Sequence, residues 1–561
     1  MTSVFPSKRG SGRAQRRPIL GAGVRPGRCF TAIAFGWVLL LSAAQMGRAE
    51  GKQIPSGAYR VAGTVVQAKG GTPLARCRVT ITDLKNRQSN KFAITGDDGR
   101  FDFHVPAGRY SLEGAKRGFI SAAYNQHDQF STAIVSGADL DTESLVLRLA
   151  PNAVLTGRVL DEFSEPVRNA QVTVYREDHS TGVSRTSTYR TAATDDQGRY
   201  EVAPIDEGTY FVSAKASPWY AVRPMSSGGA ANTPPFDTSL DVVYSVTYYG
   251  DSTEADDATP IPVRGGDRLE ADIHMDPVPA LHLLVHVPEG GDLPTLYKPG
   301  FDGAEEPEAE SVQSIAPDVY ELSGIAAGRY TVRMPGGNVA EPREVNLSSS
   351  GELDVSSAKS TSQIKATVRI AGASSLPSDL QIVLRSSKGK MSYGPVDADG
   401  EADFSDVISG KYDILAESPT QHFTVIRIAS EEETTSGHTL NVAPGTSLSI
   451  ELSLVGGAVT VEGVAKRKGK WVAGAMVVLV PKNADDYDRI RRDESELDGS
   501  FTLRDVIPGS YTVIAIEDGW DLEWAEPGAL TPYLKHGQPL EVGSRSPATI
   551  HLADAVEVLA K

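Results

Sequence analysis

Asp195-Asp-Gln-Gly-Arg-Tyr-Glu-Val-Ala-Pro-Ile-Asp-Glu-Gly-Thr-Tyr210 is the stretch that decides the fold of this chain. It opens with Asp and Gly residues, which favour a tight turn because glycine reaches positive φ freely and aspartate bonds its own backbone. Arg-Tyr-Glu-Val then alternates in the manner of a β-strand. A second glycine, Gly208, marks another corner, and Tyr210 opens the next strand. The stretch therefore predicts two strands joined by tight turns.

The same unit occurs five times in the chain. In each copy a glycine precedes a tyrosine by two positions, and an aliphatic residue follows the tyrosine by two, which is the period of a half-buried strand. Each tyrosine resembles a tyrosine corner, in which the ring packs inward and the hydroxyl bonds nearby backbone. Repetition at one point of a folding unit favours this core role over a stripe of binding residues. The five tyrosines are Tyr110, Tyr210, Tyr330, Tyr412 and Tyr511.

Length and spacing predict five modules. The chain has 561 residues, and the tyrosines are separated by 100, 120, 82 and 99 positions. Its 54 Gly and 34 Pro suit many short strands and turns. We therefore expect an all-β protein, an elongated string of about five tandem Greek-key β-sandwiches of the immunoglobulin-like or prealbumin-like kind. The predicted modules are residues 58–150, 151–278 with a loop insertion at 217–260, 279–358 (the most degenerate), 359–456 and 457–561.

The N-terminus predicts export. Residues 1–49 contain eight basic and no acidic residues, and Cys29–Ala44 is an apolar run of 16 residues. This layout is typical of a secretory signal peptide, with cleavage expected before Glu50 or, as a second choice, after Ala44. An uncleaved anchor is the alternative, although the apolar run is short for a membrane span. A general secretory route is expected, because Pro18 after the arginine pair departs from a twin-arginine signal. The predicted location is the cell envelope or the exterior.

Net charge limits the partners expected for this chain, and cysteine content limits how its modules can be stabilised. Without residues 1–49 the net charge is −25, and such a surface repels polyanions, so no nucleic-acid partner is expected. No membrane span is expected in the mature chain. Cys77 is its single cysteine, so the modules must be held by packing and not by intrachain disulfides. Cys77 itself is expected to be a small core residue.

Several motifs resemble those of a known family, the carboxypeptidase regulatory-like domain. They are Gly157–Asp161, Pro166–Val174, Thr194–Tyr200 and Gly208–Tyr210. The match is good for the first, second and fifth modules, partial for the fourth and weak for the third. The resemblance implies a prealbumin-like seven-stranded sandwich, related to Cna-B repeats and placed in a carbohydrate-binding-like fold group. It also implies an accessory or adhesive role in a secreted bacterial protein, and no enzymatic activity.

Residue patterns for catalysis or metal binding are weak in this chain. His282 and His286 are four apart but lie in an apolar strand, where a satisfied or edge-facing pair is expected instead of a zinc site. Asp397–Asp403 places three aspartates around a glycine but lacks the further ligands of a calcium loop. We therefore expect no metal, no cofactor and no enzyme. The alternative, a divergent hydrolase, requires histidines and carboxylates that only the fold brings together.

Aromatic residues are the candidate binding residues, because flat aromatic faces match the apolar faces of sugar rings. They are Trp219, Tyr248 and Tyr249 in the insertion, and Trp520, Trp524 and Tyr533 in the corresponding stretch of the fifth module. The alternative is a satellite core that packs this loop onto the sandwich, and the i, i+4 spacing of Trp520 and Trp524 suits a short helix. The predicted partner is a polysaccharide, bound in a groove of exposed aromatics, or another envelope protein, bound at an apolar patch or open sheet edge.

Overall fold

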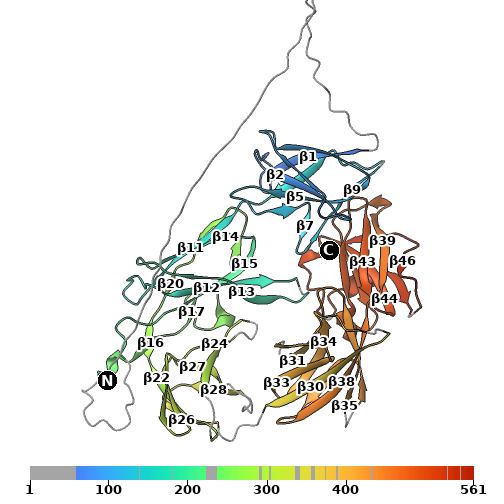
Figure 1. Ribbon diagram of the computed structural model, residues 1–561. Coiled ribbons are helices and arrows are strands. Elements are labelled where there is room, and N and C mark those ends of the chain that lie inside the picture. Colours follow the sequence, from blue (N-terminus) through green and yellow to red (C-terminus); the bar gives the residue numbers. More distant parts are fainter. Residues whose placement is uncertain are drawn as a thin grey trace, which may run out of the picture. The chain divides into compact units, whose positions relative to one another are not determined.

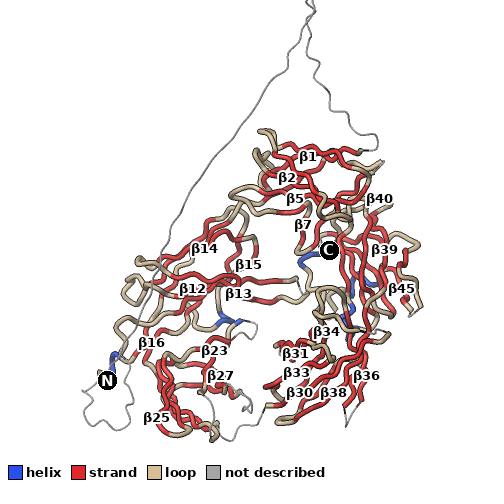
Figure 2. Tube along the Cα trace, viewed as in Figure 1, coloured by secondary structure: helices blue, strands red, loops and turns tan. Residues whose placement is uncertain are grey.

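The computed structural model describes residues 58–561, apart from 138, 181, 223–236, 290–292, 302–304, 335–341, 356–360, 373–374, 387–389, 431–433, 527 and 544. The secretory signal predicted at residues 1–49 lies outside the described residues, as does part of the predicted insertion. Strands predominate and the helices are few and short (Figure 2), so the chain is all-β, as predicted. We number the predicted modules one to five from the N-terminus; their boundaries stay a prediction.

Module one contains two sheets that enclose one cluster of buried side chains. The sheet orders are β10-β1-β4 and β3-β2-β5-β6, with β9 also paired to β5. Figure 1 labels β1, β2, β5 and β9 of these strands. Cys77 is buried in this cluster, as expected. The strands are β1 (Tyr59–Gln67), β2 (Arg78–Asp83), β3 (Asn90–Ile94), β4 (Arg100–Val105), β5 (Gly108–Ala115), β6 (Ala122–Ala123), β7 (Gln126–His127), β8 (Phe130–Ser131), β9 (Ile134–Ser136) and β10 (Leu145–Leu149).

Module two repeats this arrangement and adds short elements within the predicted insertion. Its main sheets have the orders β14-β11-β19 and β13-β12-β15-β17, and β16 pairs with β21. The insertion contributes two 3-10 helices, η1 (Thr238–Leu240) and η2 (Ala255–Asp257). The strands are β11 (Ala153–Leu160), β12 (Gln171–Asp178), β13 (Arg185–Ala193), β14 (Arg199–Ile205), β15 (Gly208–Lys215), β16 (Val242–Tyr244), β17 (Thr247–Tyr248), β18 (Ile261–Val263), β19 (Arg268–Glu270), β20 (Ile273–His274) and β21 (Pro277–Pro279).

Modules three and four each form two sheets. Their orders are β25-β26-β22-β29 and β24-β23-β27-β28 in module three, and β33-β30-β38-β35-β36 and β32-β31-β34-β37 in module four. The strands of module three are β22 (Leu281–His286), β23 (Thr295–Pro299), β24 (Glu305–Pro307), β25 (Ser311–Ala316), β26 (Val319–Ile325), β27 (Gly328–Arg333), β28 (Arg343–Leu347) and β29 (Gly351–Asp354). Those of module four are β30 (Ser362–Ile370), β31 (Gln381–Ser386), β32 (Met391–Pro395), β33 (Glu401–Val407), β34 (Gly410–Glu417), β35 (Phe423–Ser430), β36 (Thr434–Ser436), β37 (Thr439–Val442) and β38 (Ser447–Gly456).

Module five joins its two layers into one sheet, because β47 pairs in parallel with both β39 and β44. Its backbone order is β40-β39-β47-β44-β41-β42. Two 3-10 helices, η4 (Ala484–Arg489) and η5 (Gly519–Asp521), and the helix α1 (Thr531–Leu534) lie between strands. The strands are β39 (Val459–Arg467), β40 (Lys470–Trp471), β41 (Met476–Pro481), β42 (Arg491–Glu494), β43 (Ser500–Val506), β44 (Gly509–Glu517), β45 (Gln538–Val542), β46 (Thr549–His551) and β47 (Val556–Ala560).

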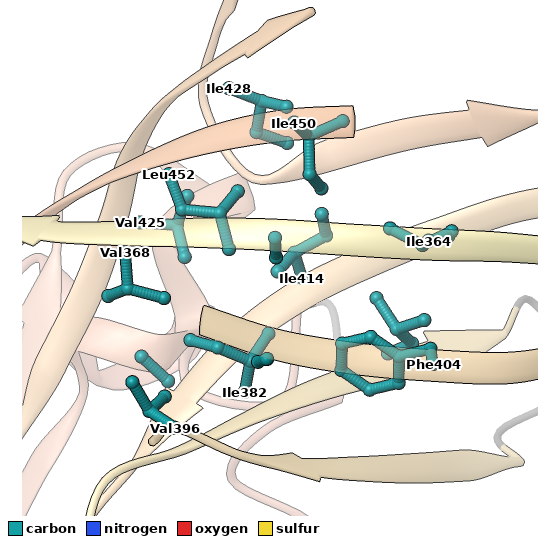
Figure 3. Close-up of a cluster of buried hydrophobic side chains, with 14 of the residues drawn as sticks. Ile364, Val368, Ile382, Val396, Phe404, Ile414, Val425, Ile428, Ile450 and Leu452 are labelled. Carbon is teal, nitrogen blue, oxygen red and sulfur yellow. The ribbon is translucent and has the colours of Figure 1, made fainter. Parts of the chain in front are cut away.

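The first strand of each module pairs in parallel with a strand near the module's end. These pairs are β1 with β10, β11 with β19, β22 with β29, β30 with β38, and β39 with β46. Each module is therefore closed by a contact between its own ends. Figure 3 shows the buried cluster of module four, in which side chains such as Ile364, Ile414 and Phe404 interdigitate from both sheets.

The Asp-Gly turns are clamped against the first strand of each module. In module five Gly499 has a φ of +77°, and its carbonyl accepts a hydrogen bond from the Ala465 N–H. A Cβ at Gly499 would lie 2.7 Å from the Ala465 carbonyl oxygen, so only glycine fits without strain. Module three has no glycine here; Asp318, with a φ of +58°, takes the same place and bonds Val287. Aspartate tolerates this conformation better than most residues do.

The five repeated tyrosines make the same hydrogen bond. Each hydroxyl donates to the backbone carbonyl four residues earlier, and each ring is buried. The bonds run from Tyr110 to Pro106 (3.1 Å), Tyr210 to Asp206 (3.1 Å), Tyr330 to Ala326 (2.8 Å), Tyr412 to Ile408 (2.8 Å) and Tyr511 to Ile507 (2.6 Å). This is the geometry of a tyrosine corner. In three of the copies the glycine two residues earlier lies under the ring, where a Cβ would crowd it.

Candidate functional site

Three of the predicted binding residues lie in one cluster on the outer face of the β41–β44 layer of module five. Trp520 and Leu530 are buried there against Met476, and Trp524 and Tyr533 pack at the margin. The indole N–H of Trp520 donates to the Gly474 carbonyl at 3.1 Å. This packing corresponds to the satellite core weighed above. Trp520 and Trp524 do not share a helix, however, because η5 ends at Asp521.

The hairpin β7–β8 of module one completes this cluster. The ring of His127 stacks on Trp520, with centroids 5.0 Å apart and planes 4° apart. Phe130 lies 5.3 Å from Trp520 in a tilted arrangement. The contact joins residues separated by more than three hundred positions. A string of modules predicts contacts between modules that are adjacent in the sequence. The contact between modules one and five was therefore not predicted.

A buried carboxylate, that of Glu494 on β42, fixes the hairpin. Its side chain is almost fully buried, and one oxygen lies 3.0 Å from Nδ1 of His127. The other oxygen accepts a hydrogen bond from the hydroxyl of Thr132, which is itself buried. Hydrogen bonds to an ionised group are among the stronger ones in proteins. Glu494 therefore ties the two modules together.

The guanidinium of Arg492, also on β42, contacts two aromatic rings of the cluster. It lies 4.3 Å from the ring centroid of Trp524 and 5.3 Å from that of Phe130, distances suited to cation–π attraction. Arg492 also donates to the Ser180 carbonyl of module two at 3.0 Å. Burial lowers the pKa of Arg492, with the carboxylate of Asp128 opposing that effect. Segments of three modules therefore meet at β42.

An ion pair lies beside this cluster. Arg109 of module one is 3.0 Å from the carboxylate of Glu496 and donates to the hydroxyl of Ser500 at 3.0 Å. Burial raises the pKa of Glu496 to about 7, and Arg109 only partly offsets that effect. The backbone N–H of Leu497 also donates to the Ala133 carbonyl. We call the contacts of modules one and two with residues 490–525 the β42 junction.

The three predicted residues of the insertion do not join this junction. Tyr248 is buried in a separate cluster with Tyr175 and Phe301, and Tyr249 packs against the main core of module two. Trp219 is 86% exposed and touches Tyr220 edge-on. The six residues therefore form no single groove, and a binding role for them stays a prediction.

The two histidines considered for zinc have separate carboxylate partners. His282 lies 2.7 Å from Asp241 and 2.9 Å from Glu321, and His286 contacts Glu352. Burial lowers the pKa of His282, but the hydrogen bonds with these two carboxylates outweigh burial and raise it overall. Across the described ranges, no three His, Cys, Asp or Glu side chains are placed to share a metal ion. Asp397, in the aspartate-rich loop, accepts hydrogen bonds from the N–H groups of its own turn.

The residues that matter most at the β42 junction were not predicted from the sequence. Arg491-Arg-Asp-Glu494 is a run of four charges, and such a run ordinarily indicates a solvated strand or loop. Three of these four side chains are largely buried: the β7–β8 hairpin covers Arg492 and Glu494, whereas Arg491 donates to backbone carbonyls within module five. The one local signal of a polar interface was that the charged residues 491–494 follow the apolar strand Met476–Pro481 in the sequence.

Comparisons with known proteins agree with this architecture for part of the chain. Residues 60–136 and 154–228 each match the carboxypeptidase regulatory-like domain. No curated protein sequence matches the chain. None of the helices in the described part has the length and hydropathy that crossing a bilayer requires.

Solved structures to which the chain is similar include two bacterial pilins. The minor pilin GBS52 of Streptococcus agalactiae is 14% identical over 39% of this chain and 97% of its own, with a TM-score of 0.20. The shaft pilin SpaA of Lactobacillus rhamnosus GG is 12% identical over 39% and 98%, with a TM-score of 0.18. The Bacillus anthracis TIE protein is 13% identical over 72% of this chain and 75% of its own, with a TM-score of 0.18.

Proposed function

Because residues 60–136 and 154–228 each match the carboxypeptidase regulatory-like domain, we propose that this is a non-catalytic structural or adhesion protein. It is exported to the cell envelope or beyond, and it acts through contacts with other proteins. The family is an accessory sandwich domain, and its repeated unit with the tyrosine hydrogen bond extends through all five modules. A chain of such units presents surface without a dedicated reaction centre.

The observation that carries this proposal is the use made of reactive side chains at the β42 junction. His127 and Glu494 form the kind of pair that general acid–base chemistry uses, yet here their contact joins module one to module five. Arg492 and Trp520, which could bind an anion or a sugar, pack against Phe130 of module one. In this chain these side chains hold modules together.

Polysaccharide binding is the second candidate, supported by one observation. Trp219 presents an open indole face, since 86% of the residue is exposed. A sugar ring stacks on such a face through its apolar C–H groups. The aromatic site predicted at Trp520 and Trp524 has less support, because Trp520 is covered.

The test uses mature protein beginning at Glu50, with photo-crosslinking groups placed at exposed positions and native envelope extract as the source of partners. The proposed function predicts a discrete cross-linked protein that survives washing with free sugars. A glycan array on the same protein tests the second candidate with Trp219→Ala, and Trp471→Ala, another exposed tryptophan, is the matched control. A glycan signal lost only in Trp219→Ala, without a cross-linked protein, would replace the first proposal by the second.

A further inference from the structure

The outer face of one sheet in module one carries exposed apolar side chains. On β3, which ends the sheet β3-β2-β5-β6, Phe92 is 62% and Ile94 is 57% exposed. Leu84, one residue after the end of β2, is also exposed. Two apolar residues at i and i+2 on an edge strand project from the same face. Such a group on a soluble protein indicates an interaction site.

In modules two, four and five an aromatic ring from elsewhere in the chain packs on part of the equivalent face. The equivalence follows from register, because the strand corresponding to β2 pairs with the tyrosine strand in the same way in each module. In module two Phe301 of module three lies 4.9 Å from Tyr175. In module four Tyr487 of module five lies 4.4 Å from Arg385. In module five the ring is that of Phe130 from module one.

The chain therefore uses this face as a docking surface for a ring carried by another module. In module one both Phe92 and Ile94 face solvent; in module four Tyr393, which corresponds to Phe92, is also 55% exposed, although Tyr487 packs on the neighbouring strand. The occupant that fits the pattern is an aromatic side chain on a loop of a β-sandwich module.

Charge narrows the choice of occupant. Residues 74–94 contain five basic side chains and one acidic side chain, within a chain whose net charge is −17. The guanidinium of Arg78 lies over the ring of Phe92, 4.8 Å from its centroid. We call Leu84, Phe92, Ile94 and their flanking basic residues the β3 patch. Its partner should combine an apolar ring with negative charge.

Such a loop is present in module two of the same chain. Phe163 is 76% exposed, between Glu162 and Glu165. The turn is fixed, because Asp161 accepts hydrogen bonds from the N–H groups of Phe163 and Glu165 at 2.9 and 2.8 Å. We call residues 161–165 the Phe163 loop. A preformed loop loses little conformational entropy on binding.

Trp219 extends this acidic, aromatic surface. Its neighbour Tyr220 donates a hydrogen bond of 2.6 Å to the carboxylate of Glu162. Two exposed aromatic residues and at least two carboxylates thus lie at one end of module two. This surface complements the β3 patch in both charge and polarity.

We propose that the β3 patch of one copy of the protein binds the Phe163 loop of a second copy. The proposal rests on the proposed function and names the partner class, a second copy of this chain. The two surfaces are different, so the contact is heterologous, and a bound pair keeps one free loop on one copy and one free patch on the other. The contact therefore propagates head to tail. Its small apolar area makes each contact weak.

Sedimentation velocity of the mature chain from Glu50, from micromolar to millimolar concentrations, tests the proposal. We expect concentration-dependent growth that weakens between about 0.1 M and about 1 M NaCl, because salt screens the charges. Phe92→Ser and, separately, Phe163→Ser should each weaken association about tenfold or more. Tyr393→Ser is the matched control, since Tyr393 is similarly exposed on β32, the corresponding strand of module four, and should change nothing.

Mixing and charge reversal make the test specific. A mixture of Phe92→Ser and Phe163→Ser chains retains one complete contact and should stop at a heterodimer. Lys91→Glu should abolish growth, and adding Glu165→Lys to the same chain should restore it. A monomer at every concentration, or loss of growth in Tyr393→Ser alone, would overturn the inference. Cross-linking of a different envelope protein by the same monomeric chain would leave the proposed function standing.

Discussion

The hydrogen bond between Thr132 and Glu494 allows a direct test of the β42 junction. Thr132 belongs to module one and Glu494 to module five, so the bond exists only when the two modules are docked. Both residues are buried. Thr132→Val removes the hydroxyl and keeps the shape of the side chain. The substitution leaves the carboxylate of Glu494 with His127 as its remaining partner in the junction.

The size of the effect follows from the charge and burial of the acceptor. A hydrogen bond to a charged group contributes about 1.5–3 kcal/mol, compared with about 1 kcal/mol for a neutral pair. We therefore expect Thr132→Val to lower the free energy of unfolding by about 2 kcal/mol in the wild type. In a Glu494→Gln background the acceptor is neutral, and the same change should cost about 1 kcal/mol.

Urea denaturation followed by tryptophan fluorescence measures both values, because Trp520 stacks on His127 within the same junction. Ser510→Ala is the control, since Ser510 donates to Glu541 on the surface of a single module. We expect that control to change stability by less than about 0.5 kcal/mol. If Thr132→Val costs no more than Ser510→Ala, or costs the same in both backgrounds, the bond to the Glu494 carboxylate does not stabilise the junction through its charge.

Three further predictions concern the turns, the pH dependence and the tyrosine hydrogen bond. Gly499→Ala should destabilise module five by about 2–4 kcal/mol in thermal denaturation, because the new Cβ meets both a positive φ and a clash with the Ala465 carbonyl. The control is Gly469→Ala, at a similar φ in open space, which should cost about 1–2 kcal/mol. Equal losses in the two variants would contradict the close contact at Gly499. Burial raises the pKa of Glu496 above its unfolded value of about 4.5, so its ionisation in the folded state is penalised. Its contribution should make the free energy of unfolding fall by about 2–3 kcal/mol as pH rises from 5 to 8. In Glu496→Gln this part of the slope should vanish, and an unchanged slope would refute the assignment. Tyr330→Phe should cost about 1 kcal/mol in chemical denaturation through loss of its bond to the Ala326 carbonyl, and no loss would argue against a shared stabilising role.

The fold could be predicted because its signals are local and repeated. Gly499 and its counterparts occupy turns that need positive φ, and Tyr511 and its counterparts open strands of period two. These requirements are met within about fifteen residues of chain, so they remain visible in the sequence. Module three shows the limit of this approach. Asp318 replaces the glycine there, and the unit reads as degenerate although its backbone is the same.

The parallel pairing of first and last strands could not be predicted, because it joins residues 68 positions apart in module three and more than eighty apart in the other modules. Nothing in the residues of β1 indicates β10 as its partner. The β42 junction is more distant still. Trp520 was identified as a candidate from its type, but its partners His127 and Phe130 belong to a module four hundred residues earlier in the sequence. Side-chain chemistry indicated which residues are unusual, and only the fold shows what they contact.

The distance along the chain between the two halves of the β42 junction sets an order of events. Glu494 lies 367 positions after His127, so the contact cannot form until the polypeptide has been made as far as β42. Until that moment the β7–β8 hairpin of module one, with the ring of Phe130, has no surface to cover it. Long-range contacts of this kind form late in folding. Closure of the junction thus distinguishes a chain that includes β42 from one that stops before it.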